Sequence, residues 1–130
     1  MEHSNSGLRP AVLVVEDEAL IQLDAVDIVT EAGFRAYDAA NADQAIRLLE
    51  EHGDIGILFT DINMPGSMNG LELARYVRDR WPLVKIILAS GQIPPRGGDM
   101  PRESVFLSKP YRAQQITSVL LEMAAQTARG

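Results

Sequence analysis

The sequence lacks cysteine altogether, has few aromatic residues and contains no long apolar run. The absence of cysteine excludes disulfide bonds and thiolate chemistry, although it leaves the redox compartment open. The first ten residues are polar and have no apolar signal-peptide core. No run approaches the ~20 apolar residues that a membrane span needs. We therefore expect a cytoplasmic protein that does not interact with a membrane.

Basic residues are also in short supply. Lys and Arg together number 12 against 18 Asp and Glu, which gives a formal net charge of −6. A protein that binds the phosphate backbone of nucleic acids needs a basic face, so this excess of acid argues against such a function. No second domain follows the last predicted helix, and we expect no DNA-binding domain.

The chain itself has the size and pattern of a single α/β domain. Its 130 residues suit one hydrophobic core, and 46% of them are hydrophobic. We expect residues 1–9 to be a disordered tail and residues 10–127 to fold. Short apolar runs alternate with segments of helical periodicity, which predicts a doubly wound, five-stranded parallel sheet with helices on both faces. The predicted strands are 11–15, 34–39, 57–61, 85–89 and 105–107, and the predicted helices are 19–32, 41–51, 71–81 and 111–127.

Two segments depart from a simple pattern. Residues 91–104 are rich in glycine and proline, which disfavour a helix interior, so the fourth helix should be short or irregular. Leu20, Leu23 and Val26 make the first helix unusually apolar near its start. These three residues could form a docking surface or widen the stripe that faces the core, and we favour the wider core.

Polar side chains follow four of the predicted strands, where each strand ends. Glu16 and Asp17 follow the first, Asp61 the third, Ser90 the fourth and Lys109 the fifth. In a parallel sheet these ends lie at one edge, where ligands bind. Crowded carboxylates repel one another unless a cation joins them, and Mg²⁺ prefers such oxygen ligands. The lysine balances a further negative charge, so a phosphoryl group is the natural ligand and an aspartate can itself carry it.

At these strand ends the chain resembles a known family. The segments that carry the resemblance are Val14–Glu18, Asp61–Gly66, Asn69–Glu72, Ala89–Gly91 and Phe106–Tyr111. In this order they resemble the receiver domain of two-component response regulators, a flavodoxin- or CheY-like fold. The resemblance covers roughly residues 10–126.

The resemblance implies a role for each residue at the acidic end of the site. Asp61 resembles the aspartate that accepts phosphate from a phosphohistidine on a partner. Asp17 would bind Mg²⁺ (or Mn²⁺) directly and Glu16 through water. Asp61 and the backbone carbonyl of Asn63 would complete the protein ligands.

The same resemblance implies a switch. Lys109 would pair with Asp61 or its phosphoryl group, and the peptide bond to Pro110 should be cis. Ser90 matches the hydroxyl that moves toward the phosphate, and Phe106 matches the aromatic ring that changes rotamer with it. The alternative for Phe106 is an ordinary core residue.

Three features depart from the commonest family pattern. Glu16 stands where many relatives have aspartate, which should preserve metal binding. The loop of residues 66–70 is longer than usual and resembles receivers attached to, or partnered with, hybrid sensor kinases. Residues 91–104 fall where the family has its fourth helix, a common dimer surface, so dimerisation through it is in doubt and at most a weak homodimer is expected.

The resulting hypothesis is a phosphoacceptor signalling domain, not an enzyme that turns over a substrate. It would take phosphate from a histidine kinase or a histidine phosphotransfer protein and then control an unknown downstream protein or pass the phosphate on. The chain could be stand-alone or derive from a hybrid histidine kinase. One alternative is a receiver-like binding module that works without phosphate. A remote one is a phosphohydrolase with an aspartyl nucleophile, which would need a general acid where this chain has the amide of Asn63.

Overall fold

A computed structural model describes residues 9–92 and 100–129 of the chain, and side chains as far as residue 126. Five parallel strands lie in the order β2-β1-β3-β4-β5, which confirms the predicted fold class. In chain order the elements are β1 (Ala11–Val15), α2 (Ala19–Glu31), β2 (Ala36–Ala39), α3 (Ala42–Glu51), β3 (Ile55–Asp61), α4 (Gly70–Arg80), β4 (Lys85–Ser90), β5 (Ser104–Ser108) and α5 (Ala113–Arg129).

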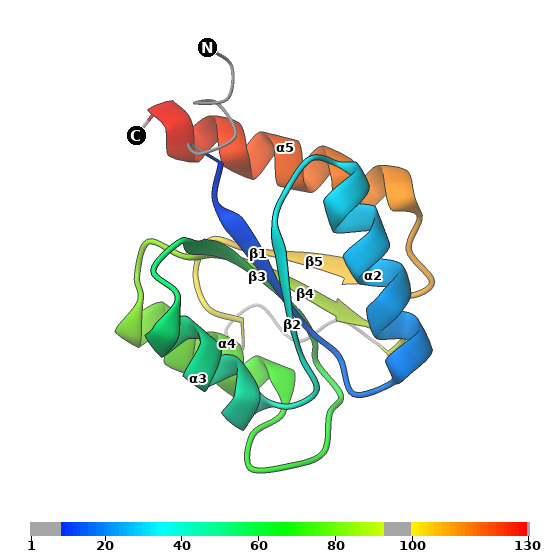
Figure 1. Ribbon diagram of the computed structural model, residues 1–130. Helices are drawn as coiled ribbons and strands as arrows, with labels where there is room; N and C mark the ends of the chain where they lie inside the picture. Colours follow the sequence, from blue (N-terminus) through cyan, green and yellow to red (C-terminus); the bar gives the residue numbers. More distant parts are fainter. Residues whose placement is uncertain (1–8, 93–99, 130) are drawn as a thin grey trace.

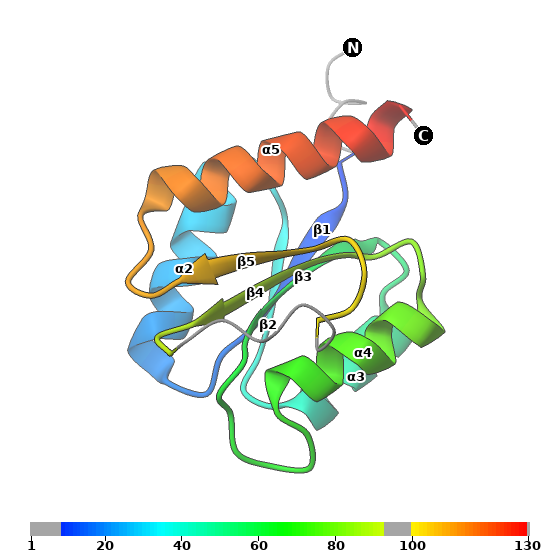
Figure 2. The ribbon, with the colours of Figure 1, turned by 180° about the vertical axis from the view of Figure 1, so that it is seen from behind.

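Helices cover both faces of the sheet. Helices α2 and α5 lie on one face and α3 and α4 on the other (Figures 1 and 2). The central strands are apolar on both faces because each face packs against a helical layer. Alternate residues of β1 show this: Val12 and Val14 belong to the core under α2 and α5, whereas Leu13 and Val15 belong to the core under α3 and α4.

The start of α4 fixes the loop that follows β3. Asn69 caps the helix by accepting a hydrogen bond from the backbone N–H of Glu72, and the Glu72 side chain accepts one from the N–H of Asn69. This reciprocal capping satisfies two N–H groups of the first turn. Gly70 then lies directly against the backbone of β3, since a Cβ atom at this position would overlap the carbonyl oxygen of Asp61. The end of β3 and the start of α4 are therefore held together.

Several boundaries differ from those predicted. Phe34 was predicted to open the second strand, but its N–H bonds to the carbonyl of Val29 and it ends the α2 turn instead, with Gly33 at φ 96°. Residues 93–99 lie outside the described part of the chain. In the rest of the 91–104 segment no helix is present, and β5 begins at Ser104.

The N-terminal boundary also differs in one residue. Residues 1–8 of the predicted tail lie outside the described residues. Arg9 contacts the folded domain, because its guanidinium lies 4.8 Å from the Phe34 ring centroid and donates to the carbonyl of Ala32.

The interpretation of the apolar start of α2 was wrong for two of its three residues. Leu20 is 81% exposed and Leu23 59% exposed, while Val26 is half-buried. The buried residues of the helix are Ala25 and Val29, so its buried stripe is narrower than predicted and Leu20 and Leu23 lie outside it. None of the described helices is both long and apolar enough to cross a membrane.

Candidate functional site

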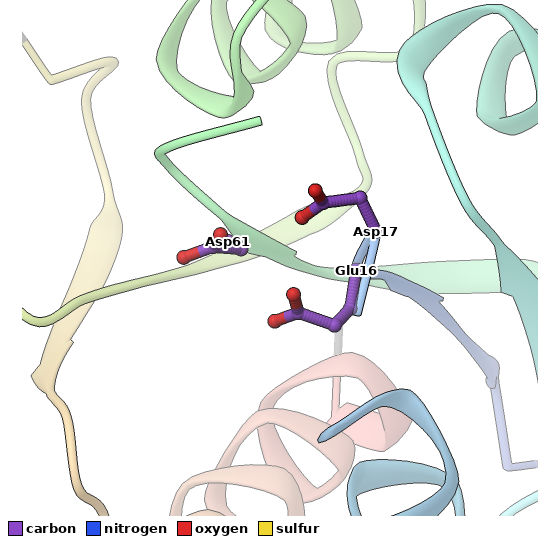
Figure 3. A group of neighbouring side chains, drawn as sticks. All are labelled: Glu16, Asp17 and Asp61. Atoms are coloured by element: carbon purple, nitrogen blue, oxygen red, sulfur yellow. The ribbon is translucent and has the colours of Figure 1, made fainter. Parts of the chain in front are cut away.

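The carboxyl edge of the sheet brings together the five strand-end residues that the sequence singled out. Glu16 and Asp17 follow β1, Asp61 and Ser90 end β3 and β4, and Lys109 follows β5. Figure 3 shows the three acidic side chains extending in the same direction from the ends of β1 and β3. The parallel topology explains this meeting, because all these strand ends point the same way.

Three carboxylates are crowded at this edge. One oxygen from each of Glu16, Asp17 and Asp61 lies within 4.8 Å of the other two. Glu16 and Asp61 are 5% and 8% exposed, whereas Asp17 is open to solvent. Among the described residues this is the one group of His, Cys, Asp or Glu side chains with the spacing of a metal site. Like charges at this separation favour a bound cation.

Lys109 supplies one such cation from the protein itself. Its Nζ lies 3.0 Å from Oδ1 of Asp61 and 3.2 Å from Oε1 of Glu16. Burial alone would lower the pKa of Lys109, but hydrogen bonds and charges from Asp61 and Glu16 outweigh it and leave the pKa raised. The ammonium group is therefore charged at neutral pH and bridges two of the three carboxylates.

The surroundings of Glu16 disfavour the charged form of its carboxylate. Burial raises the pKa of Glu16 and the charge of Asp61 raises it further, while the N–H of Glu18 and the Lys109 ammonium act against them. The Glu18 N–H donates to Oε2 of Glu16 at 3.2 Å, which fixes the carboxylate beside β1. A further positive charge bound at the site would stabilise the charged form of this buried carboxylate.

Gln22 supports this arrangement, although the sequence does not single it out as a site residue. Its side-chain amide donates to the carbonyls of Glu16 at 3.1 Å and Ala39 at 3.0 Å, so it ties α2 to the ends of β1 and β2. Its position in the first turn of α2, six residues after Glu16, is the signal that could have drawn attention to it.

The side chain of Asn63 also does something that the sequence did not indicate. The sequence predicted its backbone carbonyl as a metal ligand and did not predict a contact between its amide and Ser90. Its amide donates to Oγ of Ser90 at 2.9 Å, and the backbone N–H of Gln92 donates to the same oxygen at 3.1 Å. Ser90 is thus linked to the loops that follow β3 and β4.

The remaining predicted residues lie on or after β5. Phe106 is half-buried and packs against the core under α3 and α4. The Lys109–Pro110 peptide bond is cis, the isomer expected from the sequence. Tyr111 follows, with its ring centroid 5.7 Å from that of Phe59.

A groove of about 480 Å³ runs from the site onto the surface of α2. Its apolar wall comes from α2 and from the turn that follows Lys109. The lining residues are Leu20, Ile21, Asp24, Lys109, Pro110 and Tyr111. Leu20 therefore lines the same groove as Lys109, which contacts Asp61.

The comparison with known families decides the assignment. Residues 12–121 match the family model of the response regulator receiver domain. The chain belongs to this family. The receiver is a domain homologous to the phosphoacceptor domains of two-component signalling, which confirms the predicted class of function.

Curated relatives are much longer proteins. The receiver is 31% identical over 116 residues to the sensor kinase CckA of Brucella abortus, an alignment that covers 86% of this chain and 12% of the kinase. It is 36% identical over 86 residues to the hydrogenase transcriptional regulatory protein HoxA of Cupriavidus necator, which covers 66% of this chain and 17% of that protein. The chain thus spans less than a fifth of each of these two relatives.

Solved structures match over nearly the whole chain. A response regulator receiver protein from Sinorhizobium medicae superposes with a TM-score of 0.84 at 25% identity and covers 92% of this chain and 97% of its own. A receiver protein from Pseudomonas putida gives 0.75 at 30% identity, with 91% and 97% covered. The receiver domain of the hybrid histidine kinase CckA gives 0.74 at 24% identity, with 88% and 98% covered, and shows the shared fold.

Proposed function

We propose that Asp61 accepts a phosphoryl group from a phosphohistidine on a partner protein and that the receiver then switches conformation. The observation that carries this proposal is the placement of the Asp61 carboxylate between a lysine and two further acids. Lys109 lies 3.0 Å from Asp61, and Glu16 and Asp17 complete the cluster. A carboxylate nucleophile next to a cation and a metal-binding group suits phosphoryl transfer.

The transfer step involves one bond formed and one broken. A carboxylate oxygen of Asp61 attacks the phosphorus atom, a P–O bond forms and the P–N bond to the imidazole breaks. The electron pair of that bond stays on the imidazole nitrogen. Lys109 can move from Asp61 to the incoming phosphoryl oxygens without leaving the site, because it already bridges Asp61 and Glu16.

The acidic residues fit a hard divalent cation. Asp17, Glu16, Asp61 and the backbone carbonyl of Asn63 would hold Mg²⁺, or Mn²⁺ in its place, because these are oxygen donors at the edge of an open site. The metal would supply positive charge to offset the negative charge of the phosphoryl group.

The proposed switch uses Ser90 and Phe106. The Ser90 hydroxyl would donate a hydrogen bond to a phosphoryl oxygen on Asp61, and the Phe106 ring would change rotamer as Ser90 moves. Two features support this: Ser90 ends the strand next to Asp61, and Phe106 is only half-buried on the edge strand β5. Phosphorylation would then shift the equilibrium between two conformations of this side of the domain.

The exposed face of α2 supports the identity of the donor. A histidine kinase or phosphotransfer protein must present its phosphohistidine within reach of Asp61, and an apolar helix of that partner would pack in the groove lined by Leu20, with Leu23 exposed on the same helix. Two such helices pack through ridges and grooves, and apolar side chains fill the contact.

The scope of the proposal follows from the family. Residues 10–127 would form one regulatory domain that catalyses only its own phosphorylation and dephosphorylation. It would work in the cytoplasm, where a kinase can supply the phosphoryl group, and would control a downstream protein or pass the phosphate on.

The test is the intact mass of the protein after incubation with acetyl phosphate and Mg²⁺. We expect a gain of one phosphoryl group in the parent and none in Asp61→Asn or in the presence of a chelator. A parent that gains nothing is tested again with a phosphohistidine donor and by beryllofluoride titration. Failure in all three assays would leave a receiver-shaped binding module and would refute the phosphoacceptor proposal.

A further inference from the structure

Ser90 is held by hydrogen-bond donors from two different loops. Asn63 Nδ2 lies 2.9 Å from Ser90 Oγ, and the backbone nitrogen of Gln92 lies 3.1 Å from the same oxygen. Ser90 is 2% exposed, whereas Asn63 lies on the exposed loop after β3. The bond therefore joins a buried strand end to a surface loop, two residues beyond Asp61.

The hydrogen-bonding capacity of serine limits what Ser90 can do in this position. A hydroxyl has two acceptor lone pairs and one proton to donate. Asn63 and Gln92 use both acceptor positions, so they set the direction of the O–H bond. A change of χ1 from one staggered well to another carries Oγ out of hydrogen-bonding distance of at least one of these donors.

We propose that Asn63 is a positioning residue that holds the Ser90 hydroxyl in its resting place and so sets how readily the receiver adopts its phosphoryl-bound conformation. This inference rests on the proposed function, in which Ser90 turns to donate to a phosphoryl oxygen on Asp61. Gln92 contributes through its backbone, so only the contact with Asn63 depends on a side chain.

The strength of the contact sets the size of the effect. A ligand that needs the switched conformation binds more weakly by the factor by which the resting form is favoured. Loss of one neutral hydrogen bond changes such a ratio on the order of 2- to 10-fold. Removing the Asn63 amide should therefore tighten the binding of a phosphoryl analogue rather than weaken it, while the backbone carbonyl of residue 63 stays available to a metal.

The experiment is a double-mutant cycle with beryllofluoride as the phosphoryl analogue. The four proteins are the parent, Asn63→Ala, Ser90→Ala and the double variant, each titrated at a Mg²⁺ concentration that saturates it, as measured by calorimetry. Bound fluoride is followed by fluorine NMR. We expect Asn63→Ala to bind beryllofluoride roughly 2- to 10-fold more tightly than the parent, and the same change to have no effect in the Ser90→Ala background.

Each outcome bears on the proposal. Equal tightening in both backgrounds means that Asn63 acts directly on the bound analogue and overturns the inference. Unchanged or weaker binding by Asn63→Ala in the parent background overturns it as well. If the parent binds Mg²⁺ but not beryllofluoride, there is no phosphoryl-bound conformation for Asn63 to control and the inference is overturned, whereas the phosphoacceptor function is refuted only if the acetyl phosphate and phosphohistidine assays fail as well. A merely structural role for Asn63 would shift the urea unfolding midpoint without the dependence on Ser90.

Discussion

Lys109 is one of two lysines in the chain, and the two lie at opposite edges of the sheet. Lys85 begins β4, while Lys109 follows β5 and contacts Asp61 and Glu16. A comparison of variants at the two lysines therefore separates the effect of a charge at the site from the effect of a charge elsewhere on the domain.

Replacement of Lys109 by methionine keeps most of the side-chain volume and removes the charge. We expect phosphorylation by acetyl phosphate to slow by about 100-fold, the usual order when one group that stabilises developing charge is lost. Mg²⁺ affinity should be retained or increased, because an ammonium group that competes for Asp61 and Glu16 is gone. Mass spectrometry and calorimetry measure the two effects. Lys85→Met is the control and should match the parent in both, and a matched loss in the two variants would contradict the prediction.

Tyr111 gives a prediction about alkaline stability. Burial raises the pKa of its phenol above the ordinary value of 10.0, with smaller effects from the surrounding charges. A raised pKa means that the fold prefers the neutral phenol, so this contribution to the free energy of unfolding is present below pH 10 and is lost as the pH rises through the folded pKa.

Tyr111→Phe cannot ionise and should escape this loss. We expect parent and variant to differ little in free energy of unfolding near pH 8, within about 0.5 kcal/mol, and the variant to be the more stable at about pH 11. Urea unfolding at the two pH values measures the difference. If the difference in free energy of unfolding between parent and variant does not change with pH, ionisation of Tyr111 does not destabilise the fold and the prediction is wrong.

At the scale of elements, the N-terminal half of α2 presents two exposed leucines beside the site. Leu20 and Leu23 are exposed there, and Leu83 is 90% exposed in the turn before β4 at the other edge of the sheet. Burial of a leucine side chain in an interface is favourable by about 1.5–3 kcal/mol, so its loss should weaken a complex by tenfold or more.

Leu20→Ser with Leu23→Ser should therefore slow phosphoryl transfer from a phosphohistidine protein by about tenfold or more and leave the reaction with acetyl phosphate unchanged. The small donor needs no docking surface, which makes it the internal reference. Leu83→Ser is the matched control and should behave like the parent with both donors. An equal loss with acetyl phosphate would place the effect in the site and not in docking.

Arg78 joins α4 to two neighbouring segments from a buried position. It is 8% exposed and donates to the carbonyls of Pro82, Val84 and Arg102. Its Nη2 has no hydrogen-bond partner among the described residues, and burial lowers the pKa of the guanidinium. The arginine therefore holds the turn before β4 and the chain before β5 against the same helix.

Truncation of Arg78 to alanine should lower the free energy of unfolding by about 2–4 kcal/mol, because buried carbonyls lose their donors and a cavity is left. Urea unfolding measures the change. Arg47→Ala removes an exposed arginine from α3 and should cost less than about 0.5 kcal/mol. Similar values for the two variants would mean that the hydrogen bonds of Arg78 add nothing to stability.

At the scale of the whole molecule, the arrangement of the site was predictable wherever it depends on topology alone. Alternating strands and helices imply a parallel sheet, and a parallel sheet places Asp61, Ser90 and Lys109 at one edge wherever the exact boundaries lie. An error of two residues at Phe34 left this result untouched, because β2 supplies none of the residues of the site.

What could not be predicted depends on which side chains meet across distant elements. The contacts of Asn63 with Ser90 and of Arg78 with Arg102 span 27 and 24 residues, and nothing in the local pattern selects those partners. The exposure of Leu20 failed for a related reason. Apolar residues also occur on exposed helix faces, and periodicity alone does not show which of them the sheet covers.

The crowded carboxylates also link the site to the stability of the whole domain. Glu16, Asp17 and Asp61 come together only when β1 and β3 pair, so a divalent cation binds the folded chain and not the unfolded one. At a Mg²⁺ concentration of about 100 times Kd the free energy of unfolding should rise by about 2.7 kcal/mol. Urea unfolding with and without Mg²⁺, at matched ionic strength, measures this gain. Asp17→Asn, an exposed change of one charge, should abolish most of it, and an equal gain in both proteins would mean that Mg²⁺ stabilises the fold from elsewhere.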